Sequence, residues 1–325
     1  MRLFAYIVYD VKPSGGNAII FEHVNRLHQK GNPVVVISVR GGRPNWIKTN
    51  VRILTFWQAI FMKFDFIVCT FWPTVYVSKL LRTPYRYYFV QGWEADFYHN
   101  PLLRFLVLQT FRMVQMVITS SSYLVKHIKP YTDVVQKVEY VEINKKVFYP
   151  QPHKIDRAKP RILSVISRYH YAKGPDLYNE AATLLTQMGY SLTLVSFEKT
   201  PPTRAPITFV SNPSLRRLAL LYRKADFLLV TSRNEGYFIP GLEAMASGCV
   251  LLSTPCGGID EYAKHKKNVV VFSPERIITL PNIIDSIWKD KVRYRKLQKQ
   301  GLQTVRKYNW NRIIDQLERI YRLDR

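Results

Sequence analysis

Short apolar stretches of strand length alternate with amphipathic stretches of helix length along all 325 residues of the chain. This spacing is typical of parallel sheets whose strands are joined by right-handed helical crossovers. The predicted strands of the first half are Leu3–Tyr9, Pro33–Val39, Phe66–Phe71, Arg86–Val90, Met116–Ser120 and Lys137–Ile143. Those of the second half are Arg161–Ser167, Ser191–Phe197, Ile207–Val210, Phe227–Thr231, Cys249–Ser253 and Val269–Phe272.

The two series of strands predict two doubly wound α/β domains. The connector Asn144–Lys159 contains Pro150, Pro152 and several charges, which suits a linker. We therefore expect one domain over residues 1–150 and another over residues 151–308. Open α/β sheets bind ligands at the carboxyl ends of their strands, so two facing sheets would place the site in the cleft between them.

The chain has a formal charge of +25, and both halves share the excess of Lys and Arg. This charge predicts attraction to a polyanion, which could be an anionic membrane surface, an acidic polysaccharide or nucleic acid. A solubilising surface is the simpler alternative. The segment Met1–Asp10 runs directly into a strand-like pattern, so we expect no signal peptide. No apolar run reaches membrane-spanning length.

Three cysteines, Cys69, Cys249 and Cys256, lie in or just after apolar runs and lack the paired spacing of metal ligands. They predict reduced thiols in a cytoplasmic protein. Glu94 and Asp96 form a Glu-x-Asp pair after a predicted strand. For this pair a solvated loop is favoured over a metal site.

Two carboxylates eight positions apart, Glu235 and Glu243, lie in the stretch Ser232–Gly248. A buried strand is predicted before the stretch, Pro240 fits the first turn of a helix, and Gly248 is suited to ending it. Glu235 is therefore expected on a strand-to-helix loop and Glu243 in the first helical turn. The free amides of that turn are suited to binding phosphate.

This stretch resembles the E-x7-E signature of the retaining GT-B glycosyltransferases of family 4, which reads roughly E-G-F-G-L-P-x-L-E-A-M-A-x-G. The chain matches it at Glu235, Gly236, Pro240, Leu242, Glu243, Ala244, Met245, Ala246 and Gly248. It departs at Phe238, where the family usually has a second glycine. The resemblance implies a GT-B fold, in which two Rossmann-like domains face each other across a cleft. It also implies that a final helix, residues 309–325, packs back on the N-terminal domain.

The resemblance assigns roles to the two glutamates. Glu235 would contact hydroxyls of the transferred sugar and act in catalysis, and Glu243 would accept the ribose hydroxyls of the nucleotide. The alternatives are a solvated turn residue for Glu235 and a carboxylate stabilised by the helix dipole for Glu243. The remaining expected donor-binding residues of this loop are Gly236, Tyr237, Phe238 and Ile239.

The segment Ser167–Asp176 follows another predicted strand and resembles the family's G-R-x-x-x-x-K-G-x-D segment, with Ser167 in place of the first glycine. By this resemblance Arg168 and Lys173 would grip the diphosphate. Charge-assisted bonds of this kind are strong, and they would stabilise the leaving nucleoside diphosphate as the glycosidic bond breaks. Taken alone, the two residues would be interpreted as solvated loop cations.

The segment Pro13–Asn17 follows the first predicted strand and opens a helix, and its residues Gly15 and Gly16 allow backbone amides to approach a ligand closely. It resembles the family's Gly-Gly loop, which faces donor and acceptor. The following Phe21–Leu27 is similar to a subgroup that builds bacterial surface polysaccharides, including rhamnosyl transferases. A tight strand-to-helix turn is the alternative.

Three further polar residues are candidate contacts for the acceptor or the sugar: Asn17, Gln91 and His170. Many relatives have a histidine near the position of Gln91. A structural role is the favoured interpretation of His170.

The resemblance therefore implies a retaining, metal-independent glycosyltransferase that takes a nucleotide-sugar as co-substrate and needs no resident cofactor. The basic surface favours a glycan or lipid-linked acceptor and a peripheral position at the inner face of an anionic membrane. Two alternatives remain open. One is a nucleic-acid glucosyltransferase, and the other is a non-catalytic protein that kept the fold and binds a polyanion or a sugar.

Overall fold

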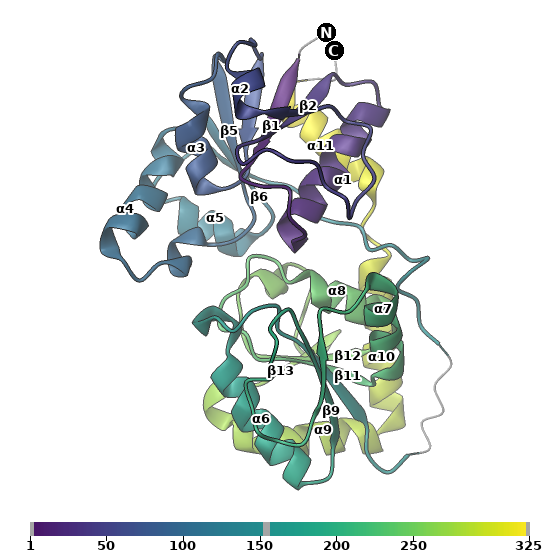
Figure 1. Ribbon diagram of the computed structural model, residues 1–325. Helices are drawn as coiled ribbons and strands as arrows, with labels where there is room; N and C mark the ends of the chain where they lie inside the picture. The colour runs from purple at the N-terminus through teal and green to yellow at the C-terminus, as the bar shows by residue number, and fades with distance from the viewer. Residues whose placement is uncertain (1–2, 152–156, 323–325) are drawn as a thin grey trace. The chain divides into compact units, whose positions relative to one another are not determined.

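The computed structural model describes residues 3–151 and 157–322, and the chain divides into two compact units. The first unit contains the chain up to Val141 and again from Asn309, and the second unit runs from Glu142 to Tyr308. Each unit is built on one all-parallel sheet with helices packed against it (Figure 1). The prediction of two doubly wound α/β domains is confirmed.

The first unit has a seven-stranded sheet in the order β3-β2-β1-β4-β5-β6-β7. Strands β1, β2 and β4 are buried along their whole length, as expected for parallel strands that are covered on both faces. The strands are β1 Phe4–Val8, β2 Val34–Ser38, β3 Ile53–Thr55, β4 Phe66–Cys69, β5 Tyr85–Val90, β6 Met116–Thr119 and β7 Val135–Lys137. The helices are α1 Gly15–Gln29, α2 Phe56–Ala59, α3 Trp72–Ser78, α4 Pro101–Gln109, α5 Ser122–Ile128 and α11 Trp310–Tyr321.

The second unit has a six-stranded sheet in the order β10-β9-β8-β11-β12-β13. Its first strand, β8, lies between β9 and β11, so the direction of winding reverses at β8. The strands are β8 Arg161–Val165, β9 Ser191–Ser196, β10 Thr208–Ser211, β11 Phe227–Val230, β12 Val250–Ser253 and β13 Val269–Val271. The helices are α6 Pro175–Gln187, α7 Leu215–Lys224, α8 Ile239–Ala246, α9 Leu280–Lys289 and α10 Lys291–Val305.

One predicted strand of the first half is wrong. The last strand of this sheet is β7, which ends at Lys137, and apart from a hydrogen bond from the Val138 N–H to the carbonyl of Thr119 the residues that follow, up to Ile143, form no strand. The polar groups of Glu139 bind helix α11 instead of a strand, because its N–H donates to Gln316 (2.9 Å) and its carboxylate pairs with Arg312 (2.7 Å). The alternating apolar pattern that predicted a strand here therefore arises from packing beneath α11.

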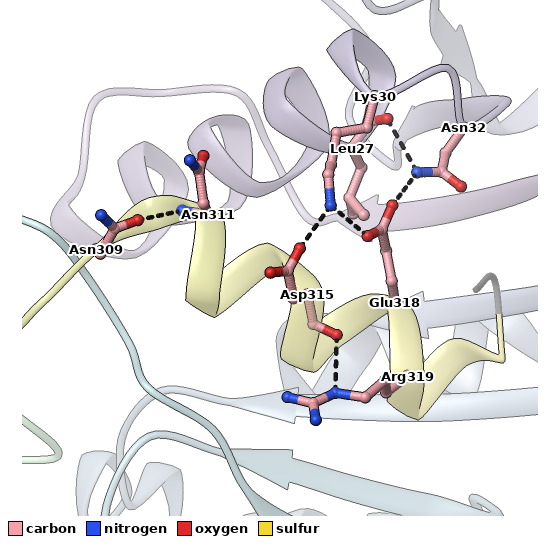
Figure 2. Close-up of polar contacts among 8 residues, drawn as sticks. All are labelled: Leu27, Lys30, Asn32, Asn309, Asn311, Asp315, Glu318 and Arg319. Atoms are coloured by element: carbon pink, nitrogen blue, oxygen red, sulfur yellow. Dashed lines mark hydrogen bonds and ion pairs between the residues drawn. The ribbon is translucent and has the colours of Figure 1, made fainter.

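Helix α11 packs on the first unit through one apolar face and one polar cluster. Tyr321 at its end shares a hydrogen bond with the buried Tyr6 of β1, at 2.7 Å between the hydroxyl oxygens. Figure 2 shows Lys30, just after α1, between Asp315 and Glu318 of α11, with Nζ–O distances of 2.6 Å to each. The buried face of the helix consists of Trp310, Ile313, Ile314, Leu317 and Tyr321.

The boundary between the units lies earlier than the predicted position at residue 150. Phe148 packs against Tyr222 of α7, with ring centroids 5.8 Å apart, and Arg223 of α7 donates to the carbonyl of Val147 at 3.0 Å. These contacts tie residues 142–150 to the second unit. Of the predicted connector 144–159, residues 152–156 lie outside the described residues.

The prediction that Glu94 lies in a solvated loop is wrong, because Glu94 is buried in the first unit. Its Oε2 accepts hydrogen bonds from the backbone N–H of Trp72 (2.9 Å) and from the hydroxyl of Tyr88 (2.7 Å). Burial raises the pKa of Glu94 to about 8. The carboxyl group therefore holds together the loops that follow β4 and β5.

The three cysteines are buried and form no disulfide. Within the described ranges, no helix has both the length and the apolar character needed to cross a membrane. The same residues contain no group of three or more His, Cys, Asp and Glu side chains arranged to hold a metal ion.

Candidate functional site

Three loops of the second unit leave the carboxyl ends of neighbouring strands. They are residues 166–174 after β8, residues 231–238 after β11 and residues 254–258 after β12. The strands β8, β11 and β12 are adjacent, so the loops meet at one edge of the sheet. The winding reverses between β8 and β11, and such switch points are where open α/β sheets bind ligands.

Glu235 lies on the middle loop and is buried, with its side chain only 6% exposed. Both carboxylate oxygens are used: Oε2 pairs with Lys173 Nζ at 2.6 Å, and Oε1 accepts from the Ser232 hydroxyl at 2.8 Å. A buried carboxylate requires such compensation. The solvated-turn alternative for Glu235 is therefore wrong, and the structure brings two of the predicted site residues into direct contact.

The first loop lies against the middle loop through a glycine. Gly174 adopts the left-handed conformation at φ 60°, and a Cβ there would lie 2.0 Å from the carbonyl oxygen of Thr231. The N–H groups of Arg233 and Asn234 both donate to the carbonyl of Ala172, at 2.8 and 3.1 Å. The backbone contacts of Ala172 and Gly174, on either side of Lys173, thus place Lys173 beside Glu235.

A second ion pair, which the sequence did not reveal, joins the same two loops. Arg233 binds both oxygens of Asp176 at 2.7 and 2.5 Å, and its guanidinium lies over the Tyr171 ring, 4.3 Å from the centroid. These hydrogen bonds hold the pKa of Asp176 below its ordinary value. Asp176 ends the Ser167–Asp176 segment, but its partner is 57 residues away, so the spacing of the sequence gave no signal of the pair.

The third loop fixes Glu235 from the other side. The N–H of Glu235 donates to the carbonyl of Cys256, and the N–H of Gly258 donates to the carbonyl of Glu235, both at 2.8 Å. A Cβ on Gly258 would lie 2.1 Å from the carbonyl oxygen of Gly236, so only glycine allows this approach. The backbone at Glu235 and Gly236 is therefore clamped between neighbouring loops.

Helix α8 begins at Ile239, and Phe238 before it takes the left-handed conformation, with φ 65° and ψ 68°. This conformation costs a non-glycine residue roughly 1–2 kcal/mol. Within the described residues the N–H groups of Phe238 and Ile239 form no hydrogen bond, and Pro240 has no N–H to offer. Amides left without a partner at the start of a helix are suited to binding an anion.

Glu243 is the fifth residue of α8, so its predicted place in the first turn is wrong. The helix starts at Ile239, and the first turn is complete at Leu242. The Glu243 carboxylate accepts a hydrogen bond from the Tyr222 hydroxyl of α7 at 3.1 Å. Burial raises the pKa of Glu243 to about 7, although the Tyr222 hydrogen bond opposes the shift. Gly248, at φ 88°, follows the end of the helix as predicted.

The other predicted residues of the second unit differ in exposure. Arg168 is exposed, and its guanidinium makes no ion pair or hydrogen bond with the described residues. His170 caps the short helical turn before Gly174, where its Nδ1 accepts from the N–H of Ala172 at 3.2 Å. Tyr237 is buried and packs against the Tyr262 ring, with centroids 5.6 Å apart.

The first unit places its predicted residues at the start of α1. A Cβ on Gly16 would lie 3.2 Å from the Gln91 Nε2 atom, and Gln91 Oε1 accepts from the Tyr140 hydroxyl at 2.7 Å. The amide of Asn17 donates to the backbone carbonyls of Asp10 and Lys12, at 3.1 and 2.8 Å. Asn17 therefore holds the turn that contains Gly15 and Gly16.

Residues 203–304 match the family model of the glycosyl transferases group 1. An uncharacterized glycosyltransferase of Methanocaldococcus jannaschii is 27% identical over 116 residues, which cover 35% of this chain and only 29% of that protein. A Campylobacter jejuni enzyme is 22% identical over 277 residues, which cover 76% of this chain and 73% of that protein. It is named N,N'-diacetylbacillosaminyl-diphospho-undecaprenol alpha-1,3-N-acetylgalactosaminyltransferase.

Solved structures show the same fold over nearly the whole chain. Sucrose-phosphate synthase from Thermosynechococcus elongatus has a TM-score of 0.82 at 18% identity, with 99% of each chain covered. The Anabaena protein HepE, in complex with UDP-glucose, has a TM-score of 0.78 at 15% identity, again with 99% of each chain covered. The fold is GT-B, and the matched segment and architecture together support a glycosyltransferase of this fold.

Replacing Gly174 tests whether close packing of two loops builds the site. In Gly174→Ala the new Cβ meets the Thr231 carbonyl, whereas in Gly189→Ala, at φ 77°, the nearest atom is a lysine side-chain nitrogen 3.8 Å away. We expect both variants to lose about 1–2 kcal/mol of unfolding free energy from the left-handed backbone. Gly174→Ala should lose about 1–3 kcal/mol more from overpacking. Urea denaturation measures both, and equal losses would contradict the tight approach.

Proposed function

We propose that the chain is a retaining, metal-independent glycosyltransferase of family 4, which transfers a sugar from a nucleotide-sugar to a hydroxyl of a glycan or lipid-linked acceptor. The observation that carries the proposal is the Lys173–Glu235 pair at the switch point, together with the unpaired amides of Phe238 and Ile239, where the loop of Glu235 enters α8. Together they offer a cation and amides for phosphate and a fixed carboxylate for hydroxyls.

The donor would bind along this edge in three parts. The diphosphate lies against the Phe238 and Ile239 amides, with Lys173 and the exposed Arg168 as counter-charges. Lys173 remains 31% exposed, so it has N–H groups to spare after binding Glu235. Glu235 takes a hydroxyl of the sugar, and Glu243 takes the ribose hydroxyls. The nucleotide-sugar complex of the similarly folded HepE supports a donor of this class.

The transfer breaks the bond between the sugar's anomeric carbon and the phosphate oxygen, and the acceptor oxygen bonds to that carbon on the same face. The proton of the acceptor hydroxyl passes to the departing phosphate oxygen, so no protein nucleophile or base is required. The leaving diphosphate gains negative charge as the bond breaks. Lys173 and Arg168 lower the barrier by stabilising that charge in a preorganised site.

The acceptor would be lipid-linked or anionic, and the protein would lie on the inner face of an anionic membrane. The charge of +25 supports this, as do the exposed side chains of Leu102 (65%) and Phe105 (56%) on α4 of the first unit, with Arg104 between them. The name of the Campylobacter relative includes a diphospho-undecaprenol carrier. Gln91 and the Gly15–Gly16 turn are the proposed acceptor-side contacts.

Turnover of a panel of nucleotide-sugars tests the activity. We expect Lys173→Ala to lower kcat by roughly 10²-fold, the order found when one electrostatic donor to a transition state is removed. Lys267→Ala, another exposed lysine of the same unit, is the control and should keep wild-type kcat. Near-normal turnover in Lys173→Ala would remove that residue from the site. No transfer or donor hydrolysis with any nucleotide-sugar in the wild type would favour the non-catalytic alternative.

The raised pKa of Glu243 predicts a pH dependence of nucleotide binding. Below pH 7 the carboxyl is protonated and loses an acceptor oxygen, so binding of a nucleoside diphosphate should weaken as pH falls through about 7. Tyr222→Phe removes the hydrogen bond that lowers this pKa, and should move the midpoint to higher pH. Calorimetric titration measures both. Glu243→Gln is the control, because the titration of the nucleotide itself is the same in every variant. If the wild type and Glu243→Gln show the same midpoint, Glu243 does not have this role.

Vesicle binding tests the membrane assignment. We expect co-sedimentation with vesicles that contain phosphatidylserine, a loss of binding with added salt, and no binding to pure phosphatidylcholine. Leu102→Asp should weaken the binding, whereas Ile278→Asp, at a 74% exposed position of the second unit, should not. Salt-sensitive binding to duplex DNA without vesicle binding would instead favour the nucleic-acid alternative.

A further inference from the structure

Phe238 has a conformation that its residue type disfavours. Four non-glycine residues within the described ranges have positive φ, namely Asn212, Phe238, Lys266 and Arg322, and of these Phe238 alone is buried. A bulky aromatic side chain in the left-handed region persists only where its surroundings hold it there. The question is therefore which contact holds the turn at the start of α8.

The hydroxyl of Tyr262 supplies this contact. It donates to the carbonyl oxygen of Phe238 at 2.7 Å, and the N–H of Gly241 in the first turn of α8 donates to the same oxygen at 3.1 Å. Gly241 makes room for it, because a Cβ at that position would lie only 2.1 Å from the hydroxyl oxygen. Burial raises the pKa of Tyr262 above its ordinary value, so the hydroxyl remains a donor.

Tyr262 is itself held in place. Its N–H donates to the carbonyl of Ile259 at 3.2 Å, and its own carbonyl accepts from the side chain of Asn268 at 2.7 Å. The side chain is 3% exposed and packs against Tyr237. The Tyr262 hydroxyl is therefore held in a fixed position as a donor to the Phe238 carbonyl.

Holding that carbonyl also sets the direction of an amide. In a planar trans peptide the C=O of one residue and the N–H of the next point in opposite directions. With the Phe238 carbonyl turned inward onto Tyr262, the Ile239 N–H of the same peptide points away from Tyr262. The N–H of Ile239 has no partner in the described residues. The Tyr262 hydroxyl, together with the Gly241 N–H, thus fixes the direction in which the Ile239 N–H points.

We propose that Tyr262 is a positioning residue of the donor site, which holds the left-handed turn at Phe238 and so aims the Ile239 amide at the donor diphosphate. This inference rests on the proposed nucleotide-sugar site. It explains how the chain keeps a phenylalanine where the sequence signature it resembles has glycine. A glycine would adopt the turn unaided, whereas phenylalanine needs a clamp.

Tyr262→Phe tests the clamp by removing one oxygen and keeping the ring. We expect the dissociation constant of the tightest binder among UDP, GDP, ADP and dTDP to rise about tenfold, as for one lost interaction. Tyr294→Phe is the matched control, because the buried Tyr294 hydroxyl also donates to a backbone carbonyl of the second unit, that of Asp226 at 3.2 Å. Tyr294→Phe should keep wild-type affinity even if its melting temperature falls.

Substitution of Phe238 separates positioning from general stabilisation. In a Phe238→Gly background the turn no longer depends on the hydroxyl, so adding Tyr262→Phe should change the affinity by less than about threefold. Phe238→Asn, which also tolerates the left-handed region, serves if the glycine variant does not fold.

An effect of Tyr262→Phe that is equally large in both backgrounds, or wild-type affinity in Tyr262→Phe alone, would overturn the inference while leaving the donor site intact. Failure of the wild type to bind any of the four nucleotides would instead overturn the proposed function, and the inference with it.

Discussion

The ion pair between Lys173 and the buried Glu235 is the interaction on which the candidate site depends. It joins two loops from neighbouring strands, and it places a carboxylate in a position that is only 6% exposed. Removing one partner would leave the other charge uncompensated, which is costly in a buried environment. An ion pair of this kind adds little net stability, because the cost of burying the charge offsets the attraction. Its position at the switch point of the sheet is what suits it to binding a ligand that carries both phosphates and hydroxyls.

Close backbone packing makes the pair possible. Gly174 and Gly258 each bring one loop so near to the loop of Glu235 that a Cβ would collide with a carbonyl oxygen. The Arg233–Asp176 pair ties the first two loops together a second time. Glu235 therefore lies on a rigid platform, and rigid placement is what a site needs if it is to stabilise charge without reorganising.

Much of the fold could be predicted because parallel strands are buried on both faces and have a strong apolar signal. The strand at Ile53–Thr55 was missed because only one of its three residues, Leu54, is buried, which gives no apolar run. The segment after Lys137 was mistaken for a strand because burial beneath α11 produces the same alternation. The loop carrying Glu235 could be predicted from its motif. The contacts of Asp176, Glu243 and Phe238 could not, since their partners Arg233, Tyr222 and Tyr262 lie 57, 21 and 24 residues away and follow no spacing rule.

A crystal structure of the protein with the nucleoside diphosphate that binds it most tightly is the most direct test of the central claim. The account predicts that the phosphate oxygens lie within hydrogen-bond distance of the Ile239 N–H and of Lys173 Nζ, at the carboxyl edge of the second sheet. Phosphates bound elsewhere on the protein, with the loops at Lys173 and Ile239 empty, would contradict it.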